Sequence, residues 1–505
     1  MHNRISLASE KKLVMGRLAG FVLLAVLACV GVANAQSWRP APTFPGLGAG
    51  TAILRPNGVV FVEEVHPTLA TGNWFLLRPD VNGNYDTGSW EPIDSLPAGY
   101  TPTYFASAVL PDGRVIVEGG EFNGSGIRVV TDMGAIYNFD GTWSSVAPPK
   151  GWTNIGDAPS VVLPDGSFMV GSCCRGLNPN SKQQAILTVD GQTLTWKETG
   201  GGKQANAENG WTLLPNGKVL TVDTGKSLVS ELYNPETGEW SKTGSLVEAV
   251  TGCETGEEIG PAVLRPNGTV FQAGANGKTA IYDSATGTWS KGPSFPINSS
   301  GHGQDGVADG PAALLPNGNV LVMASKVDPC WGTPSDFYVF DGTDLDLVPG
   351  PPNADTDLSY NGRMVELPSG HILFTDGTQD VEIFFPGGRI QDSWRPTITS
   401  YPKTVSTGVT YTIKGTQFNG FSQGAAYGDD AQMASNFPLV RVKNNASGHV
   451  FYAFTANFST MGVATGKAVV SADFTMTSGE SGASTLVVVA NGIPSNPVDI
   501  TVKVP

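Results

Sequence analysis

Apolar residues in this chain come in short runs separated by turn sequences, and they do not follow helical spacing. In AVLPDGRVIVEGG (108–120), for example, a Pro-Asp-Gly turn separates two apolar runs. Asn-Gly or Asp-Gly between such runs is the strongest short-range signal of a β-hairpin. The pattern, with Asn, Asp or Ser before the glycine, occurs seven times. The turn glycines, spaced 50 to 55 residues apart, are Gly58, Gly113, Gly166, Gly217, Gly268, Gly318 and Gly370.

A second hairpin with an aromatic end follows the first, as in IYNFDGTWSSV, LYNPETGEWSKT and IYDSATGTWSKG. The tryptophans that mark the outer strand in five repeats are Trp90, Trp143, Trp196, Trp240 and Trp289. Two hairpins in about fifty residues, repeated seven times, predict an all-β fold, a seven-bladed β-propeller with kelch-like blades.

The two ends of the repeat region predict how the ring closes and where it stops. The seventh repeat lacks a last strand of its own, and SWRPAPTFP (37–45) resembles the outer-strand segment SWEPIDSLP (89–97). We therefore expect the N-terminal segment to supply the outer strand of the last blade, the alternative being a plain N-terminal arm. After about residue 394 the pattern changes to alternating strands typical of a sandwich. We expect the propeller to span 36–393 and an immunoglobulin-like sandwich to span 394–505.

Residues 1–35 are predicted to be a cleaved signal peptide. A basic segment precedes the apolar core LAGFVLLAVLACVGVA (18–33), and Ala33-Asn34-Ala35 fits a cleavage site. The chain is therefore expected to be secreted, periplasmic or extracellular, with no membrane span. The remaining chain has 26 Lys and Arg against 44 Asp and Glu, a net charge of −18. This charge disfavours nucleic acid as a partner and suits neutral or cationic partners.

The loop that leads into the first strand of each repeat should lie on one face of the ring, where propellers commonly place ligands. Four blades place a carboxylate nine or ten residues before the turn glycine, and two others place a tyrosine. The carboxylates are Asp157, Glu208, Glu258 and Asp309, the tyrosines are Tyr104 and Tyr360, and Asn361 and His302 fall on the same face. Such a mouth would bind a cation or a hydroxyl-rich ligand such as a carbohydrate. The alternative is structural, with carboxylates accepting backbone N–H bonds between blades.

Four cysteines remain after removal of the signal peptide, and an even count in an oxidising compartment suggests disulfides. Four cysteines allow three pairings. Cys253 and Cys330 fall on loops of adjacent blades, on the same face, so we favour this pair. Cys173 and Cys174 are then left as a vicinal pair.

Seven kelch-like blades followed by a sandwich resemble the galactose oxidase family of copper radical oxidases, with its C-terminal early-set domain. In that family two tyrosines and two histidines hold copper, and one tyrosine is cross-linked to a cysteine. TYFASAVLPDG (103–113) resembles the segment of the cross-linked tyrosine, which places Tyr104 there. SYNGRMVELPSG (359–370) resembles the Tyr-His segment, with Tyr360 retained and Asn361 in place of histidine.

Two further segments depart from the family pattern. GLGAGTAILRPNG (46–58) resembles the cysteine segment but carries Ala49, and AYGDDAQM (426–433) resembles the loop of the last histidine but carries Gln432. Cu(II) prefers imidazole nitrogen to an amide. The resemblance therefore implies an incomplete copper site. We assign no cofactor, and copper is the one candidate.

Three functions follow from these observations. The first is a non-catalytic protein that binds carbohydrate or a protein partner at the mouth. The second is a copper-dependent carbohydrate or alcohol oxidase with a site rebuilt from other ligands, in which Tyr104 and Tyr360 would be catalytic. The third is a glycan hydrolase or lyase that uses carboxylates such as Glu208, Glu258 and Asp309 as acid and base.

Overall fold

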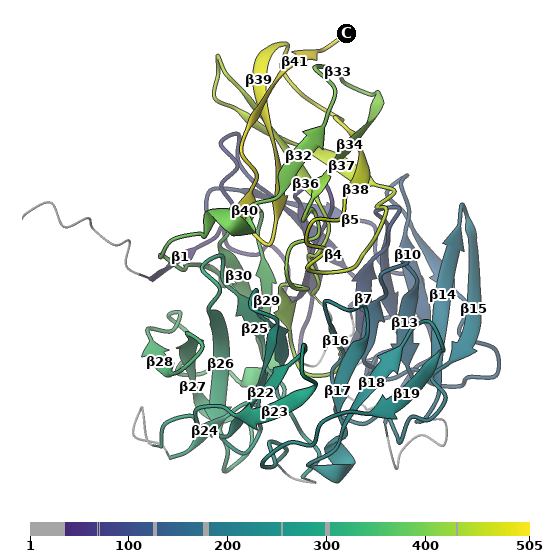
Figure 1. The fold of residues 1–505 in the computed structure, drawn as a ribbon, viewed down its shortest axis with the longest axis vertical. Coiled ribbons are helices and arrows are strands. Elements are labelled where there is room, and N and C mark those ends of the chain that lie inside the picture. The colour runs from purple at the N-terminus through teal and green to yellow at the C-terminus, as the bar shows by residue number, and fades with distance from the viewer. Residues whose placement is uncertain are drawn as a thin grey trace, which may run out of the picture.

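The computed structural model describes residues 36–67, 69, 71–124, 129–174, 181–253, 256–297, 303–430 and 433–505. The predicted signal peptide lies outside these residues. Seven antiparallel sheets form a ring, and strands β32 to β41, except β35, stack on one face of it (Figure 1). The predicted all-β class, with a seven-bladed propeller followed by a further curled sheet, is confirmed. The kelch and immunoglobulin-like assignments and the domain boundaries remain predictions.

Each blade contains four strands in the order expected from its two hairpins. The first strands of neighbouring blades contact one another, so they line the axis of the ring. The first strands are β2 (Ala49–Leu54), β7 (Ala106–Val109), β12 (Ser160–Val162), β16 (Thr212–Leu213), β20 (Ala262–Leu264), β25 (Ala312–Leu314) and β29 (Arg363–Glu366). The second strands are β3 (Val60–Glu64), β8 (Val115–Glu118), β13 (Phe168–Gly171), β17 (Val219–Val222), β21 (Thr269–Ala273), β26 (Val320–Lys326) and β30 (Ile372–Thr375).

The outer half of each blade is the second hairpin. The third strands are β4 (Trp74–Arg78), β10 (Gly134–Tyr137), β14 (Gln184–Asp190), β18 (Ser230–Asn234), β22 (Thr279–Asp283), β27 (Gly332–Phe340) and β31 (Val381–Phe385). The fourth strands are β5 (Ser89–Ile93), β11 (Trp143–Val146), β15 (Thr193–Thr199), β19 (Glu239–Lys242), β23 (Thr288–Lys291), β28 (Leu345–Val348) and β1 (Ser37–Pro40). The last of these, β1, pairs with β31 and closes the ring as the sequence predicts.

The hairpins form where they do because of turn glycines and cross-strand aromatic pairs. All seven turn glycines adopt positive φ, between 76° and 88°, which a residue with a side chain rarely does. In the outer hairpins Tyr137 lies directly opposite Trp143, and Tyr233 opposite Trp240. The ring centroids of these pairs are 5.1 and 5.4 Å apart, a contact that stabilises the strand pairing.

The second unit is one continuous curled sheet. Its strands in spatial order are β32 (Thr397–Ser400), β34 (Thr410–Thr416), β38 (Val470–Thr475), β37 (Val450–Ala456), β36 (Leu439–Asn444), β39 (Gly482–Ala490), β41 (Val498–Lys503) and β33 (Thr404–Ser406), with β40 (Ile493–Pro494) beside β39. Short pieces elsewhere are β6 (Pro102–Thr103), β9 (Phe122–Asn123), β24 (Asp305–Gly306), β35 (Ala425–Ala426) and the 3₁₀ turns η1 (Thr224–Lys226), η2 (Ser359–Asn361) and η3 (Asp392–Trp394).

The second sheet packs on the face of the ring that carries the Pro-x-Gly turns. A Cβ at Gly58 would lie 2.6 Å from the Tyr452 ring, and one at Gly113 would lie 2.4 Å from the Phe454 ring. The loop between β34 and β36 leaves this face and enters the axis of the ring. There β35 pairs with the inner strand β25, and the backbone N–H of Leu213 donates to Gln423 Oε1.

Glu366, at the end of β29, joins the propeller to the second sheet. It is buried, and its Oε2 accepts from Asn491 Nδ2 at 3.0 Å and from Ser435 Oγ at 3.3 Å. Burial raises the pKa of Glu366 to about 8 from 4.5. At pH values between these two, folding is therefore accompanied by uptake of a proton. Stability is therefore expected to fall as pH rises from 4.5 to 8, by up to about 1.4 kcal/mol per pH unit for this group.

Glu366→Gln should remove this dependence because glutamine resembles the protonated acid. Thermal midpoints measured from pH 5 to 8 should show the variant gaining on the parent protein as pH rises. The matched control is Glu198→Gln on strand β15, where the side chain is exposed, and it should follow the parent curve. Parallel curves for all three proteins would contradict a protonated Glu366.

Candidate functional site

The mouth of the ring lies on the face opposite the second sheet. Asp157, Glu208, Glu258 and Asp309 stand on the loops that lead into β12, β16, β20 and β25. The chain folds this way locally because each loop must turn from an outer strand back to the axis. Asp309 and Tyr104 make that turn with positive φ, 45° and 55°. Such φ values are strained for residues with side chains, and strain of this kind clusters at functional sites.

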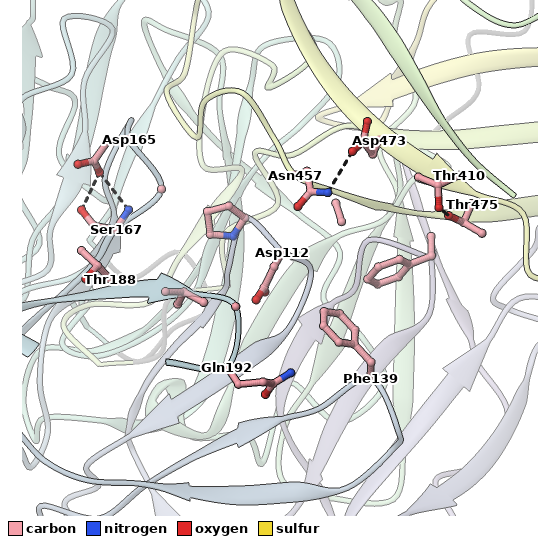
Figure 2. Close-up of a pocket in the computed structure, with 16 residues that line it drawn as sticks. Asp112, Phe139, Asp165, Ser167, Thr188, Gln192, Thr410, Asn457, Asp473 and Thr475 are labelled. Atoms are coloured by element: carbon pink, nitrogen blue, oxygen red, sulfur yellow. Dashed lines mark hydrogen bonds between the residues drawn. The ribbon is translucent and has the colours of Figure 1, made fainter. Parts of the chain in front are cut away.

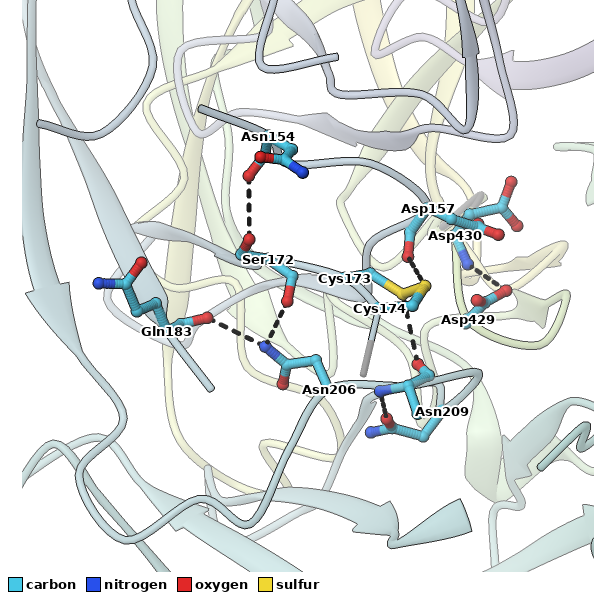
Figure 3. Close-up of a disulfide and its surroundings, with 11 residues drawn as sticks. Asn154, Asp157, Ser172, Cys173, Cys174, Gln183, Asn206, Asn209, Asp429 and Asp430 are labelled. Carbon is cyan, nitrogen blue, oxygen red and sulfur yellow. Dashed lines mark hydrogen bonds between the residues drawn. A yellow bond between two sulfur atoms is a disulfide. The ribbon is translucent and has the colours of Figure 1, made fainter. Parts of the chain in front are cut away.

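Three carboxylates meet at the axis. The carboxylate oxygens of Asp157, Glu208 and Asp429 all lie within 4.8 Å of one another. Asp429 comes from the inserted loop of the second unit, and Asp157 lies beside Asp429 and Asp430 in Figure 3. We call Asp157, Glu208, Asp309, Asp429 and Asp430 the axial acids.

The axial acids repel one another, and Asp429 and Asp430 are buried while Asp157, Glu208 and Asp309 are half-buried. Burial and then Asp430 and Glu208 raise the pKa of Asp157 well above its ordinary value. Burial and then Glu258 and Glu208 do the same for Asp309. Hard oxygen donors gathered in this way suit Ca²⁺ or Mg²⁺ rather than copper. Of the predicted mouth residues, His302 and Gln432 lie outside the described residues.

A cavity of about 530 Å³ opens beside the axial acids, between blades one, two and seven. Both predicted tyrosines, Tyr104 and Tyr360, line it, together with Asn361 and His66. The ring of Phe122 lies 6.0 Å from that of Tyr104. Burial raises the pKa of Tyr104 and Tyr360 above that of a free phenol, so both hydroxyls stay protonated at neutral pH. We call this cavity the tyrosine pocket.

Glu63, on the second strand of blade one, also lines the tyrosine pocket. It is 4% exposed, and one carboxylate oxygen accepts from the backbone N–H of Thr51 at 3.3 Å. Burial raises its pKa to about 8, although the Thr51 bonds and the charge of Arg363 oppose this. The acid is therefore largely protonated at pH 7 and can both donate and accept a hydrogen bond.

Arg363 places a buried positive charge beside the two tyrosines. Its Cζ lies 3.9 Å from the Tyr427 ring centre and 5.3 Å from that of Tyr104. Its Nη1 donates to the carbonyl of Tyr360 at 2.7 Å, and its Nη2 lies 3.9 Å from Asp430 Oδ2. Burial opposes the charge, but the Tyr427 ring and the Asp430 carboxylate beside the guanidinium outweigh burial and raise the pKa of Arg363.

The tyrosine pocket does not fit the copper centre that the family resemblance implies. Among the described residues that line it, His66 supplies the one imidazole, and an amide stands at Asn361. A fixed guanidinium beside Tyr104 would also repel a metal cation. Within the described residues, the sets of His, Cys, Asp and Glu close enough to hold a metal contain no histidine. No step through copper is derived for this site.

Both cysteine pairs are joined by disulfides in the structure. Cys253–Cys330 ties the loop before β20 to the loop between β26 and β27, across two neighbouring blades. Cys173–Cys174 lies against the axial acids, and Cys174 Sγ is 3.7 Å from the carbonyl of Asp157 (Figure 3). The two pairs therefore rigidify the mouth at separate places.

Several residues of the site were missed by reasoning from the sequence. They are Glu63, Arg363, Tyr427, Asp429 and Asp430. Adjacent acids in AYGDDAQM were a signal, since two carboxylates in a loop directed at an acidic mouth would meet the others there. Arg363 gave a weaker signal, a charged residue at the start of an otherwise apolar inner strand.

Comparison with known proteins supports the fold. A fungal alcohol oxidase in complex with copper aligns with 93% of this chain and 100% of its own, at 15% identity and a TM-score of 0.55. Extracellular domains of two putative hybrid two-component systems from B. thetaiotaomicron align with 91% and 94% of this chain. Those two alignments cover 56% and 60% of the other chains, at 9% and 10% identity, with TM-scores of 0.46 and 0.44.

At 15% identity the likeness to the fungal alcohol oxidase concerns the fold alone. No protein-family model and no curated protein matches the sequence. Within the described residues, no helix is long and apolar enough to cross a bilayer.

Proposed function

We propose that this protein is an exported binding protein that holds a hydroxyl-rich ligand, a carbohydrate, in the tyrosine pocket without oxidising it. The observation that supports this most is Arg363, whose fixed charge lies beside Tyr104 where the family resemblance calls for a copper ligand. A guanidinium is not redox-active, but it is an effective hydrogen-bond donor to oxygen.

The lining of the tyrosine pocket suits a sugar. The hydroxyls of Tyr104 and Tyr360 and the protonated carboxyl of Glu63 can donate to ring and hydroxyl oxygens. Asn361 offers both a donor and an acceptor, and aromatic rings such as that of Phe122 can pack against the C–H face of a sugar ring. A volume of about 530 Å³ lies within the range of small-molecule sites, large enough for one or two sugar units.

Carboxylate-based hydrolysis is the second candidate. Glu63, protonated at neutral pH inside the cavity, has the protonation state of a general acid. The carboxylates first considered for this role, Glu208, Glu258 and Asp309, do not line the tyrosine pocket. Product analysis during the binding measurements would detect cleavage.

The first test combines metal analysis with ligand binding on one sample. After incubation with copper and desalting, we expect less than stoichiometric copper and no peroxide with sugars or alcohols. The same sample should bind at least one sugar of a glycan array, confirmed by calorimetry. Stoichiometric copper with peroxide release would instead establish an oxidase, and an empty array would leave a protein partner as the ligand.

A matched pair of variants locates the binding. Tyr360→Phe removes one hydroxyl from the tyrosine pocket and should weaken binding about fivefold, the effect of one lost hydrogen bond. Tyr401→Phe removes a hydroxyl from the second sheet, outside the pocket, and should leave the affinity unchanged. Equal affinities for all three proteins would place the ligand elsewhere.

A further inference from the structure

A second cavity lies on the opposite face of the ring, where the second sheet meets blades two and three (Figure 2). Its volume is about 590 Å³. The propeller contributes Asp112, Phe139, the Asp165–Ser167 turn and the hairpin around Gln192, and the second sheet contributes strands β34, β37 and β38. Cavities between two units are common places for ligands. We call this cavity the inter-unit crevice.

We propose that the inter-unit crevice binds a neutral oligosaccharide, independently of the tyrosine pocket. The first reason is an exposed aromatic ring. Phe139 lies in the turn between β10 and β11, is 58% exposed and lines the inter-unit crevice. Its ring meets that of Phe454 edge-on at 6.0 Å, which fixes its orientation. An oriented ring at the edge of a polar cavity is a platform for the C–H face of a sugar.

The second reason is the set of polar groups around this platform. Gln192 Oε1 faces Arg114 Nη1 at 3.5 Å, which leaves the amide nitrogen of Gln192 available to donate. Asp165 receives the N–H and the hydroxyl of Ser167 on one oxygen, Oδ1, and Asp165 is not fully buried. Asn457 also lines the crevice and donates to Asp473 Oδ2 at 3.0 Å, which orients its amide.

The charge of the inter-unit crevice selects among sugars. Its lining includes the carboxylates of Asp112, Asp165 and Asp473 and no lysine or arginine. The guanidinium of Arg114 is engaged by Asp112 at 2.7 Å and by a backbone carbonyl, and only 2% of that residue is exposed. Uronates, sulfated sugars and phosphates would be repelled. Neutral hydroxyls, which donate well to carboxylates, fit this lining.

The crevice lies too far from the tyrosine pocket to share one short ligand with it. The chain from Asp157 at the mouth to the Asp165 turn at the crevice passes through the inner strand β12 (Ser160–Val162). Eight residues of chain reach at most about 25 Å when extended. A polymer bound in the crevice would therefore hold the protein with its mouth directed away from the attachment point.

Calorimetry with neutral hexasaccharides (cellulose, mannan, xylan and chitin fragments) and with a polygalacturonate fragment would test the proposal. Asn457-Phe458-Ser459 is an N-glycosylation motif, so the protein should come from a bacterial host, where no glycan would fill the crevice. We expect binding of at least one neutral hexasaccharide and none of the uronate. Phe139→Ala should weaken binding of the neutral hexasaccharide about tenfold, as for a typical aromatic anchor, and Phe139→Trp should retain this binding.

Two controls keep the test decisive. Val469→Ala changes another exposed apolar residue, 64% exposed and outside the crevice, and should bind like the parent protein. Gln192→Ala should weaken binding without changing the thermal midpoint. Absence of binding by every hexasaccharide, or binding that Phe139→Ala leaves unchanged, would overturn the proposal. The second result would still be compatible with a ligand in the tyrosine pocket, since Tyr360→Phe reports on that site separately.

Discussion

Arg363→Met should destabilise the protein by about 3–5 kcal/mol at neutral pH, the cost of leaving a buried charge without its partner. Arg363 is 4% exposed, and Asp430, at 3.9 Å from its Nη2, is fully buried. Methionine retains much of the volume but not the charge. Asp430 would then face Asp157, Asp309 and Asp429 without the guanidinium, and the stacking of Arg363 on the Tyr427 ring would be lost.

The pH dependence separates this explanation from simple loss of packing. The pKa values of Asp157, Asp309 and Asp429 are raised by burial and mutual repulsion, so these acids take up protons as pH falls. The loss of stability caused by Arg363→Met should therefore be larger at pH 8 than at pH 5. Chemical denaturation at both values gives the comparison, and adding Asp430→Asn should recover part of the loss.

Arg265→Met is the matched control. Arg265 also stacks on a ring, with Cζ 5.0 Å from the Phe340 ring centre, and donates to two backbone carbonyls. Arg265 lies away from the axial acids. Arg265→Met should therefore lower the stability less than Arg363→Met does, and by the same amount at pH 5 and pH 8. If Arg363→Met also caused only a small, pH-independent loss of stability, the negative charge of Asp430 would be balanced by a group other than Arg363.

The parts of the fold that the sequence predicts well are those encoded by local signals. Turn glycines such as Gly166 need positive φ, and alternating strands beside them need a partner, so the hairpins and their number follow from the chain itself. The ring closure by 37–45 was predictable for a similar reason. One blade lacked an outer strand, and one unassigned segment had the matching tryptophan.

The parts that the sequence did not predict depend on contacts between distant residues. Asp429 and Asp430 reach the axis because β35 pairs with β25, more than a hundred residues earlier in the chain. Nothing local in AYGDDAQM specifies that pairing. Arg363 likewise looks like an ordinary strand residue until Tyr427 and Asp430 are placed around it. The candidate tyrosines were identified from a resemblance, whereas the charge that argues against copper came from the three-dimensional arrangement.

Removing residues 37–40 should open the ring and have the other large effect on stability. Strand β1 pairs with β31 through four residues, and Trp38 lies opposite Phe384. Its ring centre is 5.2 Å from that of Phe337, 5.7 Å from that of Phe374 and 5.0 Å from that of Phe384. Trp38 Nε1 also donates to the carbonyl of Pro349 at 2.7 Å. Trp38 is half-buried, so loss of the tryptophan alone should cost about 2–3 kcal/mol, less than for a tryptophan in the core.

Deletion should do more than Trp38→Ala because it also exposes the edge of β31. An open, apolar strand edge pairs readily with another chain, so the deleted protein should melt earlier and elute as larger species in size-exclusion chromatography. Trp90→Ala is the matched control, since Trp90 also bonds to a backbone carbonyl, that of Pro42, from an outer strand. Strand β5 stays attached to β4 by its hairpin, so Trp90→Ala should lose stability without self-association. If the deletion behaved like Trp90→Ala, the N-terminal strand would add packing to the last blade without being what closes the ring.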